Sequence, residues 1–177
     1  SLLKMSGAVT GITVLLIIIF LFKEGLGLFK SSTVEKGYTL VVNAQNPVSR
    51  LTAVEIKEIF DSEIENWKDV GGSNEDIRIF RFDEIFTMYS DEELGEDYSL
   101  LPQKLGEIIQ SDSTIIAFLP LKYVPKNMSG IKKLKTDIIS ISDFFLGTIW
   151  LPTATPSALF GILPLIAGTL LVSFIAI

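Results

Sequence analysis

Charged residues are concentrated in the middle of this chain, and both of its ends are apolar. No charged residue occurs in residues 8–22 or in residues 144–177. Residues 38–140 hold nearly all of the charge, and this segment is long enough to bury a core of its own. The pattern predicts a folded lobe that lies between two membrane segments.

The first apolar run predicts a transmembrane helix over residues 5–23. Residues 5–22 carry no charge and approach the roughly 20 residues that cross the hydrocarbon core of a bilayer. A cleaved signal peptide is the alternative, with an apolar core of about 7–15 residues and a small-residue cleavage site after it. The sequence KEGLGLFK follows instead. We therefore expect a retained span and a juxtamembrane connector over residues 24–37.

The C-terminal apolar region divides into two parts. Residues 141–156 are too short and too interrupted by prolines to cross a membrane, so we expect an interfacial segment with Trp150 at headgroup depth. Residues 157–177 predict a second transmembrane helix, kinked at Pro164. This helix has small residues of the kind that pack helices together in a multi-helix membrane protein, namely Gly161, Ala167, Gly168 and Thr169.

Apolar periodicity predicts alternating strands and helices within residues 38–140. We expect strands at residues 38–43, 77–82 and 115–119, the first of them buried on both faces in a mostly parallel sheet. Thr52 and Glu55 form the sequence pattern of a capping box, which starts an amphipathic helix. Residues 102–110 predict another helix. The expected fold class is a three-layer α/β lobe flanked by two transmembrane helices.

The composition removes most of the chemistry that an enzyme would use. The chain has no cysteine and no histidine, and its remaining carboxylate pair, Asp83-Glu84, has no serine nucleophile elbow beside it. The acidic run in residues 91–97 lacks the ligand spacing and central glycine of a calcium loop. A net charge of -6 weighs against nucleic acid. We expect no catalytic residue, no cofactor, no metal site and no nucleic-acid partner.

Short motifs follow one another in a characteristic order through the middle segment. They are Asn46-Pro47, Leu51-Thr52, Ile59-Phe60, Asn66-Trp67, Val70-Gly71-Gly72 and Arg81-x-Asp83. In this order they resemble phosphate-binding proteins of ABC importers. The resemblance runs from about residue 38 to residue 137, which corresponds to a single lobe of a two-lobed binding protein of periplasmic type.

The resemblance implies a phosphate site after the second predicted strand. The family surrounds the anion with an Arg, an Asp and a Ser-Gly-Thr turn, so Arg81, Asp83 and Thr87 are the candidate ligand-binding residues. Ile85 and Phe86 stand where the family has Ser and Gly, which removes a hydroxyl and the glycine that permits close backbone approach. Pairing of Arg81 with Asp83, or a helix cap, is the structural alternative. We expect one such lobe to bind phosphate weakly or not at all.

The two ends of the chain carry a second resemblance. The segments FLFKEGLGLF, FFLGTIWLP and GILPLIAGTLLVSFIAI resemble the start of phosphate ABC transporter permeases of the PstC type. This resemblance implies an N-terminal fragment of a multi-pass permease in the bacterial cytoplasmic (inner) membrane, with the lobe inserted into its first external loop.

The implied function is that of a permease subunit of an inorganic phosphate importer, in which the lobe serves docking, structural or weak ligand-contact roles. Its implied partners are the lipid bilayer, a second permease subunit, cytoplasmic ATPase subunits that hydrolyse the ATP, and an extracytoplasmic phosphate-binding protein. The alternative is a membrane-anchored phosphate-binding or sensing module without a pore.

Overall fold

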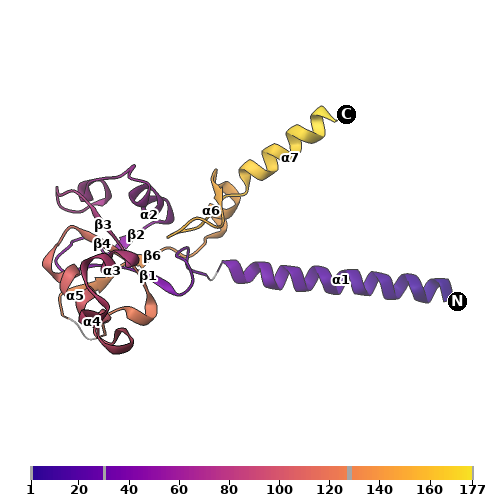
Figure 1. Ribbon diagram of the computed structural model, residues 1–177. Coiled ribbons are helices and arrows are strands. Elements are labelled where there is room, and N and C mark those ends of the chain that lie inside the picture. The colour runs from indigo at the N-terminus through magenta and orange to yellow at the C-terminus, as the bar shows by residue number, and fades with distance from the viewer. Residues whose placement is uncertain (1, 30, 127–128, 177) are drawn as a thin grey trace.

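The computed structural model describes residues 2–29, 31–126 and 129–176, which form a mixed α/β lobe with two projecting helices (Figure 1). Residue 30 of the predicted connector, residues 127 and 128 of the predicted lobe and residue 177 of the second predicted span lie outside the described residues. The helices are α1 (Leu2–Leu28), α2 (Ala53–Phe60), α3 (Ile85–Met88), α4 (Asp91–Leu94), α5 (Leu101–Ser111), α6 (Ile141–Leu146) and α7 (Leu163–Ile175). The strands are β1 (Tyr38–Asn43), β2 (Arg50–Leu51), β3 (Arg78–Arg81), β4 (Ile115–Pro120), β5 (Ile131–Lys133), β6 (Lys135–Thr136), β7 (Trp150–Leu151) and β8 (Leu159–Phe160). Short 3-10 helices are η1 (Trp67–Val70), η2 (Phe82–Glu84), η3 (Glu96–Tyr98) and η4 (Leu121–Tyr123).

The central sheet has four strands in the order β3-β4-β1-β5. β3 and β4 run parallel, whereas β1 pairs antiparallel with both β4 and β5. The prediction of a mostly parallel sheet is therefore wrong. It rested on the burial of both faces of β1, which is typical of parallel strands. In this lobe the same burial arises because β1 lies in the middle of the sheet with apolar clusters on both faces.

Two apolar clusters, one on each face of the sheet, hold three layers together. On one face Leu105 of α5 belongs to the same cluster as Val41 of β1. On the other face Ile56 of α2 belongs to the same cluster as Val42 of β1. Neighbouring residues of β1 thus enter opposite layers, as the two-residue repeat of a strand requires. The predicted three-layer α/β lobe is confirmed.

The predicted start of α2 is also confirmed. The Thr52 hydroxyl accepts a hydrogen bond from the Glu55 N–H at 3.2 Å, and the Glu55 carboxylate accepts one from the Thr52 N–H at 2.7 Å. Such reciprocal bonds satisfy N–H groups that the first turn of a helix leaves free. α5 covers the second predicted helix and has Pro102 in its first turn, where the missing N–H costs no hydrogen bond.

Within the described part of the chain, α1 is the helix that is long and apolar enough to cross a membrane. Residues 11–28 meet that criterion, and none of them is buried against the rest of the protein. The helix runs past residue 23, where the predicted span ends, to Leu28. No proline interrupts the sequence KEGLGL, so the backbone hydrogen bonds continue into the predicted connector.

α7 begins at Leu163 instead of residue 157 and has 13 residues, fewer than a span requires. Leu159 and Phe160, which precede α7, form strand β8, and β8 pairs antiparallel with β7. Pro164 lies in the first turn of α7, so the predicted kink is wrong: proline at that position displaces no helical hydrogen bond. The apolar side chains toward the end of α7 are exposed, with Phe174 at 85%.

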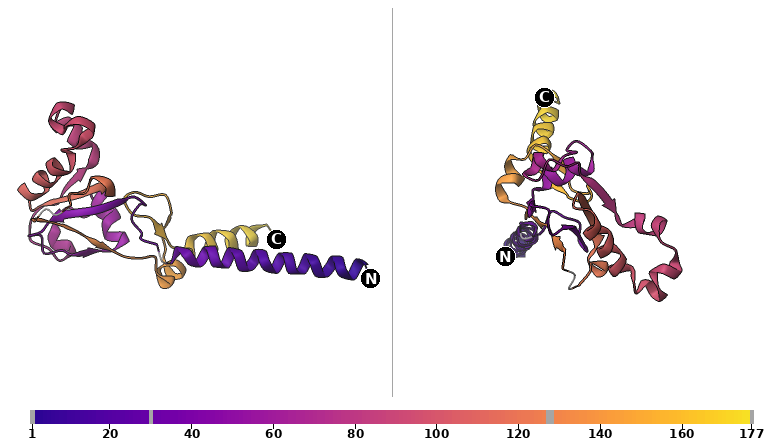
Figure 2. Two further views of the ribbon diagram at one scale, coloured as in Figure 1. Left: turned by 90° about the horizontal axis from the view of Figure 1, so that it is seen from below. Right: turned by 90° about the vertical axis from the view of Figure 1, so that its left-hand side faces the viewer.

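Both apolar helices leave the lobe on the same side, as Figures 1 and 2 show. Their bases are joined by a β-bridge between Val34 and Ser157 and by the Ala158 N–H, which donates to the Thr33 carbonyl at 2.8 Å. Residues 31–34 and 138–162 therefore form a small folded unit beside the helices, which we call the membrane-proximal unit. Residues 141–156, predicted as an interfacial segment, lie within it.

Candidate functional site

The three residues predicted to contact phosphate lie together where β3 ends. β3 runs parallel to β4, so the carboxyl ends of both strands meet at one edge of the sheet, where α/β proteins commonly bind ligands. Arg81 is the last residue of β3, Asp83 lies in η2 and Thr87 lies in α3. The structure thus brings the three residues into one continuous turn at a suitable edge.

Arg81 is held by neighbours inside the lobe. Its guanidinium lies over the Phe60 ring of α2, 5.7 Å from the ring centroid. Its backbone N–H donates to the Glu84 carboxylate at 2.7 Å. Among the ion pairs of the described residues, none joins Arg81 to Asp83. Arg81 occupies the N-cap position of η2. Of the two structural alternatives, the geometry favours the cap.

The other polar groups of the turn are poorly arranged for an anion. The Thr87 hydroxyl donates to the Glu84 carbonyl at 2.7 Å, so its proton serves the backbone of its own turn. Asp83 is exposed, and two carboxylates on adjacent residues beside Arg81 repel a negative ligand. Arg81 is left as the one cation of this turn, and it lies in an exposed position where a charge pair is weak.

Ile85 and Phe86, which stand where the family resemblance predicts Ser and Gly, have packing roles. Ile85 is fully buried in the cluster beneath α5. Phe86 is exposed and contacts Phe82 and Tyr98 edge to face, with ring centroids 5.6 Å apart in both pairs. Restoring a polar turn here would require the removal of a core side chain. The turn therefore works as part of the lobe's packing and offers an anion little beyond Arg81.

Two of the motifs that carry the resemblance, Asn46-Pro47 and Asn66-Trp67, stabilise the opposite edge of the sheet. The Trp67 indole N–H donates to the Thr114 carbonyl at 2.8 Å, and the side chain is 1% exposed. The Asn46 side-chain oxygen accepts the Val48 N–H at 2.9 Å, which fixes the turn after β1. A polar cavity of about 180 Å³ lies beside these residues. These motif residues thus build the scaffold.

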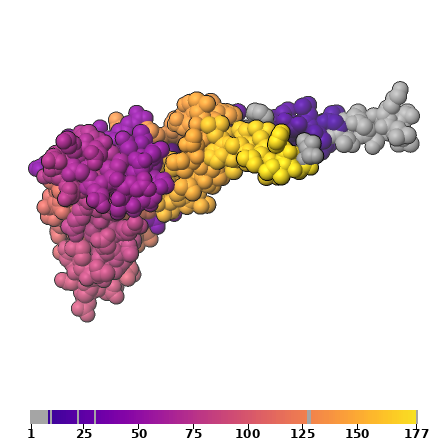
Figure 3. Space-filling model, turned by 90° about the horizontal axis from the view of Figure 1, so that it is seen from above, coloured from indigo at the N-terminus to yellow at the C-terminus, as the bar shows by residue number. Residues whose placement is uncertain are grey.

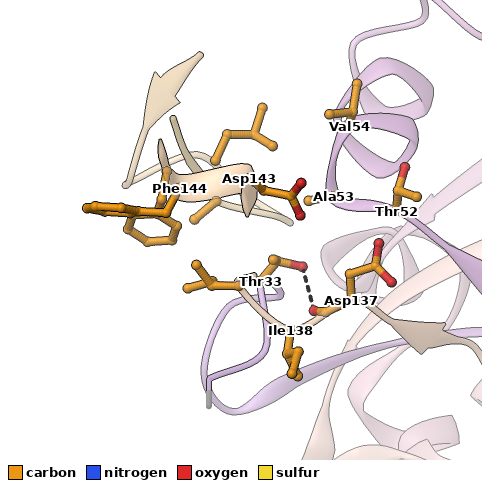
Figure 4. A pocket seen from close by; sticks show the side chains of 12 residues that line it. Thr33, Thr52, Ala53, Val54, Asp137, Ile138, Asp143 and Phe144 are labelled. Carbon is orange, nitrogen blue, oxygen red and sulfur yellow. Dashed lines mark hydrogen bonds between the residues drawn. The ribbon is translucent and has the colours of Figure 1, made fainter. Parts of the chain in front are cut away.

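A larger hollow, of about 350 Å³, lies between the start of α2 and the membrane-proximal unit (Figure 4). The Thr33 hydroxyl donates to the Asp137 carbonyl at 3.2 Å on its wall, and Asp143 points toward the start of α2 (Figure 4). Asp137 is itself paired with Arg50, whose Nε donates to it at 2.8 Å. The described lining contains no lysine or arginine, so this hollow is unsuited to phosphate.

Sequence reasoning missed this hollow because its walls come from segments far apart in the chain. Residue 33 was assigned to the connector, residues 52–54 and 137–139 to the lobe, residues 143 and 144 to the interfacial segment and residues 158–160 to the second span, and only the fold places them together. No local pattern marks them. The hollow lies between the lobe and the membrane-proximal unit, and its walls are carboxylate and apolar side chains.

Two acidic side chains outside the turn, Glu93 and Asp112, are engaged in local structure. Hydrogen bonds from the Ser90 backbone N–H and hydroxyl lower the pKa of Glu93, which completes the capping box of α4. Burial acts to raise the pKa of Asp112, but hydrogen bonds from Thr114 and the Arg78 guanidinium outweigh it and lower that pKa. Among the described residues, no three acidic side chains are grouped to hold a metal ion.

A family model described as a PBP superfamily domain matches residues 21–83, which is under half of the chain. No curated protein matches. Among solved structures, an ABC-type phosphate transport receptor from Vibrio cholerae is similar over 64% of this chain and 52% of its own, at 20% identity and a TM-score of 0.42. PstS from Borrelia burgdorferi is similar over 60% of this chain and 49% of its own, at 16% identity and a TM-score of 0.43.

The chain therefore spans about half the length of these structures. The family match and the three-layer α/β architecture agree with the expected lobe of binding-protein type. The match ends at Asp83, so it reaches Arg81 and Asp83 and stops before Thr87.

Proposed function

We propose that this chain belongs to a permease subunit of an ABC-type inorganic phosphate importer, with the binding-protein-like lobe inserted between two of its spans. The observation that carries the proposal is the departure of α1 and α7 from the same side of the lobe, with their bases joined at Val34 and Ser157. A tethered receptor needs one anchor, whereas a lobe inserted in a loop is held at both ends.

In this proposal the lobe has a docking and structural role, and transport itself belongs to the membrane helices. The partners are a second permease subunit, cytoplasmic ATPase subunits that hydrolyse ATP, and an extracytoplasmic phosphate-binding protein that delivers the ion. The chain lies in the cytoplasmic (inner) membrane with the lobe outside. The exposed apolar surfaces of α1 and α7 support the membrane location, because apolar surfaces of that extent are rarely left in water.

We expect the lobe to be extracytoplasmic and both chain ends to be cytoplasmic. Ser73 is exposed on the lobe, and the chain has no cysteine, so Ser73→Cys provides a single label site. A membrane-impermeant maleimide should label this variant in intact cells. A control variant, Leu3→Cys, which precedes the predicted span, should be labelled only after the membrane is opened. Labelling of Ser73→Cys only after permeabilisation would reverse the proposed orientation.

The chain itself should bind phosphate more weakly than about 1 mM, because Arg81 is exposed and an exposed charge pair contributes only about 0–1 kcal/mol. Isothermal titration of phosphate into the chain in lipid nanodiscs measures this, with Arg81→Ala as the matched control. The two proteins should give indistinguishable heats. Micromolar binding that disappears in Arg81→Ala would identify a functional site and favour the anchored binding or sensing module.

A further inference from the structure

A row of aromatic rings crosses the surface of the lobe beyond β3 and β4. Tyr98 contacts Phe86 at 5.6 Å between ring centroids, Phe86 contacts Phe82 at 5.6 Å, and Phe82 stacks on Tyr123 at 5.3 Å. These residues come from η3, α3, η2 and η4, so four separate segments converge to form the row. Its outer end carries large side chains in water: Phe86 is 42% exposed, Tyr98 38% and Leu100 44%.

The surroundings of the outer end of this row are acidic, whereas at its inner end the Lys122 ammonium lies over the Tyr123 ring, 4.3 Å from the ring centroid. No lysine or arginine occurs in residues 82–103. Carboxylates in that stretch lie in η2, α4 and η3, and they are Asp83, Glu84, Asp91, Glu92, Glu93, Glu96 and Asp97. An exposed apolar centre with a charged rim of a single sign is the arrangement of a protein interface, in which the rim selects a partner of opposite charge.

The backbone holds the outer end of the row in a fixed position. Asp97 has φ 52° and Tyr98 has φ 58°, so two consecutive residues other than glycine adopt the left-handed conformation. Side chains disfavour this conformation, and it persists where surrounding structure imposes it. Tyr98 is thereby pre-positioned against Phe86, which reduces the entropy lost when a partner packs on it.

The position of this surface selects among possible partners. In Figure 3 the segment around residues 90–100 projects sideways from the half of the lobe that is remote from α7 and the described part of α1. A membrane that holds those helices therefore cannot reach it, and anionic headgroups would be repelled by its carboxylates. A second copy of the chain would bring two acidic rims together, which is also unfavourable. The partner that fits this surface is therefore a soluble protein with a basic surface.

We propose that Phe86, Tyr98 and Leu100, with the acidic residues around them, form a docking surface for a soluble extracytoplasmic protein that presents an apolar patch rimmed by lysine and arginine. We call this surface the acidic-aromatic tip. The partner's identity rests on the proposed function: in a phosphate importer it is the binding protein that delivers phosphate. Aromatic anchors supply the binding energy, and the carboxylates orient the approach.

The test uses the complete importer in lipid nanodiscs, with its purified phosphate-loaded binding protein as the probe. Phe86→Ala and Tyr98→Ala should each weaken binding of that protein about tenfold or more, as loss of an interface anchor does. Glu96→Lys should weaken it most at low salt, because the rim acts through screened charge. The matched controls lie on the α2 side of the sheet: Val54→Ala and Glu65→Lys should bind as the wild type does.

A second measurement distinguishes the loss of an interface contact from the misfolding of a variant. A photo-crosslinking benzoylphenylalanine in place of Tyr98 should crosslink to the binding protein, whereas the same group in place of Val54 should not. The docking proposal is overturned if the tip variants bind the binding protein as the wild type does and position 98 gives no crosslink. If the wild-type importer still imports phosphate in that case, the proposed function is left intact. Absence of phosphate import by the wild-type importer overturns the proposed function and this partner with it.

Discussion

Ile85→Ser should lower the free energy of unfolding of the lobe by about 2–5 kcal/mol, although the family resemblance predicts a serine at this position. Ile85 is fully buried and packs in the cluster beneath α5. A serine there loses the apolar contacts, leaves a cavity and buries a hydroxyl. Denaturant unfolding of the chain in detergent micelles, followed by circular dichroism, measures the loss.

Thr87→Ser is the matched control, because Thr87 is exposed and keeps its hydroxyl bond to the Glu84 carbonyl in that variant. It should change the stability by less than about 0.5 kcal/mol. If Ile85→Ser were equally mild, the turn could rotate its residues outward at little cost. The claim that packing has replaced the anion-binding turn would then fail.

Trp67→Ala should destabilise the lobe by about 3–5 kcal/mol, the range for truncating a large buried aromatic side chain. Trp67 is 1% exposed and packs in the cluster beneath α2. The backbone is fitted closely around it, since a Cβ added at Gly72 would lie 2.8 Å from the Trp67 Cβ. The turn at Gly72 therefore packs directly against Trp67.

Trp67→Phe separates packing from hydrogen bonding at the same position. It keeps an aromatic ring but loses the indole N–H that donates to Thr114, which should cost about 1–3 kcal/mol because the carbonyl loses its partner. The same unfolding experiment compares the two variants. Equal losses in Trp67→Ala and Trp67→Phe would mean that the hydrogen bond, and not the burial of the ring, makes this motif residue important.

Local signals in the sequence were sufficient for much of the lobe. The capping box of Thr52 and Glu55 marks the start of α2 because both of its hydrogen bonds join residues only three positions apart. The strands at residues 38–43 and 115–119 were visible as apolar β-prone runs. Strand direction was not visible, because burial on both faces depends on what covers the sheet.

The properties of the candidate site depended on contacts that no local pattern records. The sequence placed Arg81, Asp83 and Thr87 in one turn, but the use of the Thr87 hydroxyl by the Glu84 carbonyl appears only in three dimensions. The place of Ser157 also appears only in three dimensions. This residue was expected in a membrane helix, but it forms a β-bridge with Val34. Each outcome was decided by a long-range partner or by the geometry of one turn.

Phosphate uptake tests the central claim most directly. Cells grown at low phosphate, with other phosphate importers removed, should take up radiolabelled phosphate when they express the complete importer and should lose most of this uptake when the gene for this chain is deleted. Trp67→Ala should reduce uptake through loss of the folded lobe, whereas Arg81→Ala should leave it nearly unchanged. Uptake that persists at the wild-type rate without this chain would contradict the permease account.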